Sequence, residues 1–182
     1  LNSYHSIHLM GNKIQEHIPT IRPMLQSFVA LEIAEETPKS VIIKDFLDMN
    51  GIVLENTLKR MDMMVRTMLG ESTESEIPDH VRTKDEEVNK LYFLLSRHLK
   101  SALITPSLSE KLGLTHDQIL SQWYLVLNLE NLADYVKDIH DSVCDIEKFI
   151  DGLDAEKFLK DRKTINAVVR SLEIIGEASK KI

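Results

Sequence analysis

Apolar side chains recur every three or four residues over three long stretches of this chain, and that spacing restricts it to a mainly α-helical fold. The stretches cover about residues 53–69, 79–104 and 116–150. Such a pattern lines apolar side chains along one side of a helix, where they must be buried against another element. The polar breaks between the stretches are short, so we expect the helices to pack side by side as a bundle.

The first stretch carries several methionines, at Met61, Met64 and Met68. A methionine stripe at helical spacing could mark a special surface, but methionine also fills irregular gaps in protein cores. We therefore interpret this stripe as core packing.

The first fifty residues have a different pattern. Residues 4–10 alternate apolar and polar side chains, which predicts a strand, and residues 13–30 have helical spacing interrupted by Pro19 and Pro23. Residues 31–35 and 40–44 predict two further strands joined as a hairpin. We expect a small α/β unit in front of the helices.

These patterns predict three parts of the chain. Residues 1–50 would form the α/β unit, residues 51–150 the helical bundle, and residues 151–182 two further helices, at 154–160 and 164–181. Residues 101–115 hold Pro106, Gly113 and several Ser and Thr side chains, and are predicted to form a loop or an interrupted helix.

Composition excludes several classes of function. The formal net charge of −7 and the pI near 5.5 disfavour binding of nucleic acid, because the surface repels phosphates. No apolar run approaches the roughly 20 residues that span a bilayer, so no membrane insertion is expected. The single cysteine, Cys144, excludes an internal disulfide framework and predicts a reducing, cytoplasmic location.

Paired carboxylates are the strongest candidate site. Glu130 and Asp134 are four residues apart, so they share one face of the predicted helix, where like charges repel by roughly 0.2–0.5 kcal/mol per pair. A hard cation such as Mg²⁺, Mn²⁺, Ca²⁺ or iron would turn this cost into binding. The alternative is a solvated acidic face that Lys137 partly neutralises, and spacing alone favours it.

Other catalytic signals are missing from the sequence. The seven histidines are scattered, without His-x-x-x-His or Glu-x-x-His spacing, and no Gly-x-Ser-x-Gly segment occurs. The missing Glu-x-x-His pairs also disfavour an enzyme with a two-metal carboxylate centre. Cys144 is interpreted as a small core residue rather than a nucleophile. We therefore expect no enzymatic activity.

Two segments resemble the acidic helices of archaeal PhoU-like regulators of phosphate uptake. They are KDEEVNKLYFLLSRHL at 84–99 and NLENLADYV at 128–136, and segments 31–37 and 57–61 fit in the same order. The resemblance implies a helical bundle that binds divalent or iron-type metal ions through pairs of acids four residues apart. Glu130 and Asp134 match such a pair; Asp85 matches too, but Asn89 stands where an Asp is usual.

The main prediction follows from that resemblance. The chain would be a non-enzymatic, metal-binding regulator that acts through protein contacts. Its metal ligands would be Asp85, Asn89, Glu130 and Asp134. The resemblance further implies a phosphate transporter or sensor protein as partner and a homodimer as the assembly.

The C-terminal segment resembles a second family. Residues 154–164 and 167–178 are similar to HepT-type toxins, helical ribonuclease subunits of toxin–antitoxin pairs, and the similarity extends back to about residue 134. That family's catalytic signature, an Arg followed by His-x-Tyr, is absent and would lie beyond Ile182. The alternative prediction is therefore a HepT-type toxin–antitoxin interaction module that lacks its ribonuclease motif.

Overall fold

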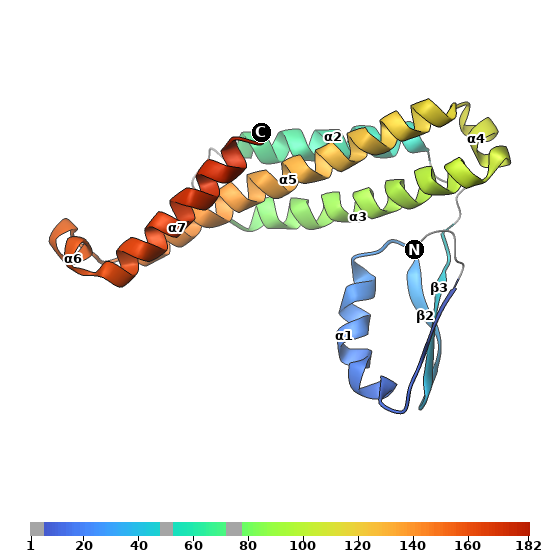
Figure 1. Ribbon diagram of the computed structural model, residues 1–182, viewed down its shortest axis with the longest axis horizontal. Helices are drawn as coiled ribbons and strands as arrows, with labels where there is room; N and C mark the ends of the chain where they lie inside the picture. The colour runs from blue at the N-terminus through green and yellow to red at the C-terminus, as the bar shows by residue number, and fades with distance from the viewer. Residues whose placement is uncertain (1–5, 48–52, 72–77) are drawn as a thin grey trace. The chain divides into compact units, whose positions relative to one another are not determined.

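The computed structural model describes residues 6–47, 53–71 and 78–182, and within them the protein is mainly α-helical with one small sheet (Figure 1). This confirms the predicted fold class. The elements are β1 (Ser6–Met10), α1 (Ile14–Gln26), β2 (Leu31–Thr37), β3 (Ser40–Asp45), α2 (Leu54–Glu71), α3 (Pro78–Ile104), α4 (Pro106–Leu112), α5 (His116–Ile150), α6 (Ala155–Lys160) and α7 (Arg162–Ser179).

Contacts divide the chain into two compact units. The first combines Leu1–Met61 with Asn89–Leu127, and the second combines Asp62–Val88 with Asn128–Ile182. The predicted domains at 1–50, 51–150 and 151–182 stay a prediction. None of the described helices is long and apolar enough to cross a membrane. The cytoplasmic location likewise stays a prediction.

The sheet of the first unit is antiparallel, with strand order β1-β3-β2. A two-residue turn joins β2 to β3, because Thr37 pairs with Ser40, and this confirms the predicted hairpin. The Thr37 hydroxyl stabilises the turn, since it lies 2.7 Å from the Ser40 hydroxyl and accepts a hydrogen bond from the Ser40 backbone N–H. A bulge interrupts β2 between Ile33 and Glu35.

Helix α1 covers one face of this sheet and closes a small apolar core (Figure 1). The buried residues of that core are Ile18, Leu31, Val41 and Ile43. Pro19 and Pro23 lie inside α1 without ending it. Both prolines are on the exposed side of the helix, where water can hydrogen-bond the carbonyls that proline leaves unpaired.

Within the first unit, Arg97 of α3 fastens the α/β part to the helices. Its guanidinium donates hydrogen bonds to the Val29 carbonyl at 2.9 Å and to the Asp45 carboxylate at 3.2 Å. The Arg97 side chain is only 7% exposed, and burial lowers its pKa, which Asp45 partly opposes. The rings of Phe28 and Phe93 also contact each other, with centroids 4.6 Å apart and planes tilted by 43°.

The methionine stripe of α2 is confirmed as core, because Met61 and Met68 are completely buried. Residues 106–112, which lie in the segment predicted to be a loop or an interrupted helix, form the short helix α4. Pro106 occupies the first helical turn, where proline loses no hydrogen bond, and Gly113 ends the helix at a φ of +65°. The Ser and Thr residues that suggested a loop include the N-cap residue Thr105, and Ser107 and Ser109 within α4.

Helix α5 has the predicted bounds, and a reciprocal cap fixes its start. The Thr115 N–H donates to the Gln118 side-chain oxygen at 2.9 Å, and the Gln118 N–H donates to the Thr115 hydroxyl at 3.3 Å. At the other end, Gly152 takes a φ of +69°, a conformation that glycine adopts without strain. The chain turns there and continues into α6.

Candidate functional site

Three of the four predicted metal ligands belong to the second unit, where their carboxyl groups influence one another. Asp85 lies on α3, and Glu130 and Asp134 lie on α5. Asp85 is only 5% exposed. Burial raises its pKa to about 6; the Lys137 ammonium opposes this shift, whereas Asp134 adds to it through its charge and a side-chain hydrogen bond.

Glu130 also lies close to these acids. Burial raises its pKa, and the nearby charges of Asp134 and Asp85 raise it further. The fourth predicted ligand, Asn89, comes one helical turn after Asp85 on α3 but falls in the first unit. The structure therefore brings together Asp85, Glu130 and Asp134, and the role of Asn89 stays a prediction.

The acids of this group combine a raised pKa with a nearby positive charge, and their role as metal ligands stays a prediction. A raised pKa means that Asp85 holds a proton more readily, and a proton shared with Asp134 relieves the repulsion that a cation would otherwise relieve. Lys137 supplies a positive charge at the same place. Among the residues that the structure describes, no three His, Cys, Asp or Glu side chains are placed to hold a metal ion.

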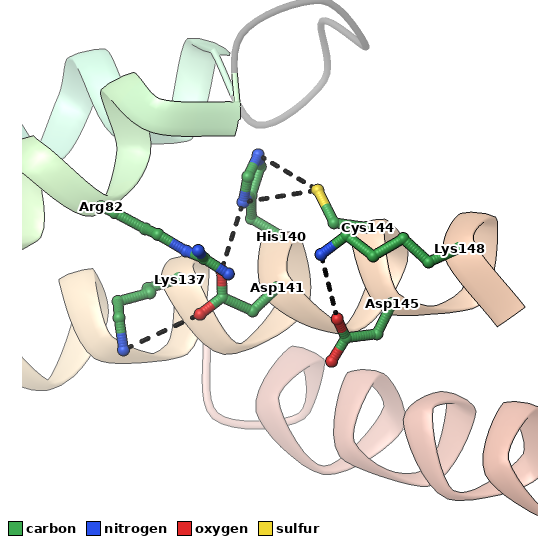
Figure 2. Close-up of polar contacts among 7 residues, drawn as sticks. All are labelled: Arg82, Lys137, His140, Asp141, Cys144, Asp145 and Lys148. Atoms are coloured by element: carbon green, nitrogen blue, oxygen red, sulfur yellow. Dashed lines mark hydrogen bonds and ion pairs between the residues drawn. The ribbon is translucent and has the colours of Figure 1, made fainter.

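A second polar group extends along α5 from the same acids, and sequence reasoning did not identify it (Figure 2). The Arg82 side chain of α3 donates a hydrogen bond from Nε to the Asp141 carboxylate at 2.8 Å. Lys137 Nζ lies 3.9 Å from the other oxygen of Asp141. Asp141 thus connects α5 to α3 through Arg82, a residue 59 positions earlier in the sequence.

His140 and Cys144 lie next to that ion pair (Figure 2). The His140 Nδ1 atom is 3.6 Å from Asp141 Oδ1, and the Cys144 sulfur is 3.8 Å from His140 Nε2. The two residues are one turn apart on α5, so helical spacing alone brings them together. The i, i+4 spacing could have predicted the contact between His140 and Cys144. The ion pair of Arg82 with Asp141 could not be predicted in this way, because it forms only when α3 packs against α5.

After α5, the chain forms a helical hairpin in the second unit (Figure 1). Asp154 caps α6 by accepting the Lys157 N–H at 2.8 Å. Asp161 caps α7 by accepting hydrogen bonds from the N–H groups of Lys163 and Thr164. The Lys157 N–H lowers the pKa of Asp154, and the Thr164 hydroxyl, at 2.7 Å, lowers the pKa of Asp161. Two N-caps within eight positions fix where the short helix ends and α7 begins.

Helix α7 returns along α5 (Figure 1). Near its end, the Lys181 ammonium lies 5.0 Å above the ring of Tyr135, a residue of α5. Ser171 and Ala178 are buried on the inner side of α7, seven residues apart. Small side chains at this two-turn spacing allow close packing of the helix.

The family match falls on this hairpin. The family described as Ribonuclease HepT-like matches residues 139–182, which are the end of α5 with α6 and α7. A Thermococcus cleftensis protein named "Probable ribonuclease HepT" is 53% identical over 49 residues, which are 27% of this chain and 44% of that protein. A Methanocaldococcus jannaschii protein named as a putative RNase is 46% identical over 48 residues, 26% of this chain and 40% of its own length.

This chain thus spans less than half the length of the curated relatives that it matches. No solved structure matches it. The similarity confirms the HepT-like part of the sequence analysis and locates it in the C-terminal helices.

The main functional prediction was wrong. None of these comparisons supports a PhoU-like protein, a role in phosphate uptake, or a transporter or sensor partner. The acids that carried the resemblance, Asp85, Glu130 and Asp134, are real neighbours, but acids at helical spacing also occur wherever two helices exchange charges with lysine and arginine. The metal-binding regulator is therefore replaced by the HepT-like alternative.

Proposed function

We propose that residues 139–182 form a HepT-like helical module through which this chain binds a partner protein of the toxin–antitoxin type. The observation that supports the proposal most directly is the coincidence of the family match with one structural piece, the hairpin of α5, α6 and α7. The proposal concerns binding rather than catalysis.

The outward side of α7 offers a surface for such a partner. Val169 and Leu172 are 48% and 54% exposed, and their spacing of three residues places them on one face of the helix. Gly176 follows on the same face, and open space surrounds the position that a side chain would take. Exposed apolar residues grouped on one helix face are typical of a protein contact.

Charged residues flank this apolar face. Arg170 and Glu173, three residues apart, form a 3.1 Å ion pair that is exposed to solvent. An apolar centre with a polar rim is the usual composition of an interface between soluble proteins.

Binding to a nucleotidyltransferase-type antitoxin provides the test. In co-expression and pull-down, the wild-type chain should retain the antitoxin, and Leu172→Lys should weaken binding about 10- to 100-fold, because it places a charge at the centre of the face. Leu125→Lys is the matched control, since Leu125 is 45% exposed on α5 but lies in the first unit. Equal retention by both variants, or no retention by the wild type, would contradict the proposal.

The relatives are named as ribonucleases, so catalysis needs a separate test. The matched segment contains one histidine, His140, whose neighbours are Asp141 and Cys144. We expect the chain by itself to leave single-stranded RNA intact over hours of incubation. Cleavage by the wild type that His140→Ala abolishes would show an active ribonuclease and contradict a role limited to binding.

A further inference from the structure

The sheet of the first unit has two outer strands, β1 and β2. The sequence of β2 disfavours pairing with a further strand, whereas that of β1 does not. Strand β2 carries Glu32, Glu35 and Glu36 and is interrupted by a bulge, two features that prevent an edge from pairing with another strand. Strand β1, with the sequence SIHLM, has no charged residue and no proline, and it pairs with β3 in one uninterrupted register. In the described part of the chain, no strand pairs with the outer edge of β1.

The backbone of β1 shows which groups face that edge. The Gly11 N–H donates to the Lys39 carbonyl at 2.9 Å, which marks the first hydrogen-bonded pair of the β1–β3 ladder. Hydrogen-bonded pairs alternate along an antiparallel ladder, so the odd-numbered residues of β1 bond to β3. The even-numbered residues, Ser6, His8 and Met10, therefore direct their N–H and C=O groups outward.

We propose that β1 is a self-pairing edge, where two copies of this chain join their β1 strands in antiparallel orientation about a two-fold axis at His8. In that register His8 faces His8 of the second copy, and Ser6 faces Met10. All three are the outward-bonding residues, so every free donor of one strand meets an acceptor of the other. The two sheets become one continuous sheet with a single isologous interface.

The side chains agree with this register. Ile7 and Leu9 pack on the α1 side of the sheet, and pairing about His8 places Ile7 opposite Leu9 of the second copy. The apolar layer therefore continues across the junction. His8 and Met10 are exposed on the opposite face, Met10 at 81%, so neither must leave a packed core to make the contact.

A second copy fits this edge better than a strand of another protein for a reason of symmetry. Within the described residues 6–10, β1 places an outward-bonding residue, His8, at its centre, so this segment complements itself without an offset. Its neutrality matters because the chain carries a net charge of −7, and two copies of a charged surface repel each other. Directly opposed like charges, which would prevent self-pairing at β2, do not occur at β1.

Charge variants at the centre of the edge test the proposal on the full chain. Light scattering should show the wild type at about twice the 20.9 kDa mass of one chain. His8→Glu and His8→Lys should each be monomeric, because two like charges would face each other across the axis. An equimolar mixture of the two variants should restore the dimer, since Glu then faces Lys.

Glu35→Lys on β2 is the control and should leave the dimer unchanged, while circular dichroism checks that each variant folds. A monomeric wild type at about 100 μM overturns the proposal. So does a dimer that persists in both His8 variants, which would indicate contact through another surface such as α7. Failure of the mixture to restore the dimer excludes pairing about His8. Disulfide formation by His8→Cys in a Cys144→Ser background, with none by Thr37→Cys, would confirm the register.

Discussion

Asp85 is the residue whose protonation is most strongly coupled to folding in the described structure. Its folded-state pKa of about 6 exceeds the ordinary value of 3.8, so the protonated form favours the folded state. The stability that it contributes is complete below about pH 4 and is lost as the pH rises through 6. The change corresponds to an order of magnitude of about 2–3 kcal/mol.

We therefore expect Asp85→Asn to stabilise the protein at pH 7.5 by about 1–3 kcal/mol, and to have much less effect at pH 4.5. An asparagine keeps the shape of the side chain and can donate a hydrogen bond to Asp134. Urea unfolding across pH 4.5–7.5 measures the difference between variant and wild type. Glu86→Gln is the control, because Glu86 is exposed on the same helix. If Asp85→Asn changed the free energy of unfolding by the same amount at every pH, the assigned pKa would be contradicted.

At the scale of elements, the attachment of the small sheet to α3 depends on Arg97. Arg97→Met keeps the apolar volume but removes the guanidinium from the Asp45 carboxylate, which among the described residues retains the hydrogen bond from the Leu47 N–H at 2.9 Å. We expect a loss of about 2–4 kcal/mol in the free energy of unfolding, measured by denaturant titration. The loss should shrink when Asp45→Asn is present, because the unpaired charge is then absent. Additive effects of the two substitutions would mean that the pair is not coupled.

The elements themselves were largely predictable, and the exceptions have physical causes. The apolar periodicity predicted both ends of α5, because the apolar spacing along this helix is unbroken and the N-terminal cap uses only neighbouring residues, Thr115 and Gln118. It left α4 open between a loop and an interrupted helix, because Pro106 and Gly113 resemble loop residues but act as the start and end of a short helix. In α1 the prolines are tolerated only because they face solvent, which periodicity did not indicate.

In the whole molecule, α2, α3 and α5 each run through both compact units without a break. A continuous helix should make the two units unfold together, because fraying at the junction costs hydrogen bonds in both. Asn128→Pro, at the first α5 residue of the second unit, should break the helix at a cost of about 3 kcal/mol. The variant should then unfold less cooperatively, because only α2 and α3 still run through both units without a break.

The single tryptophan allows unfolding of the first unit to be measured separately from the loss of helix in the whole chain. Trp123 belongs to the first unit, so its fluorescence reports that unit alone, whereas far-ultraviolet circular dichroism reports all helices. The two signals should coincide during urea unfolding of the wild type and separate in Asn128→Pro. Asn128→Ala is the control and should keep them together. Separate transitions in the wild type would show that the continuous helices do not couple the units.

The sequence by itself determined the helical class, the small sheet at the start and the HepT-like character of the last 44 matched residues, because these depend on local spacing and on residue identity. It also identified Asp85, Glu130 and Asp134 as a group. Only the packing of α3 against α5 shows that Asp85 is buried, shares a hydrogen bond with Asp134 and lies near Lys137. Burial, charge and hydrogen bonding between distant segments set the chemistry of a carboxylate, and none of the three can be read from its spacing along one helix.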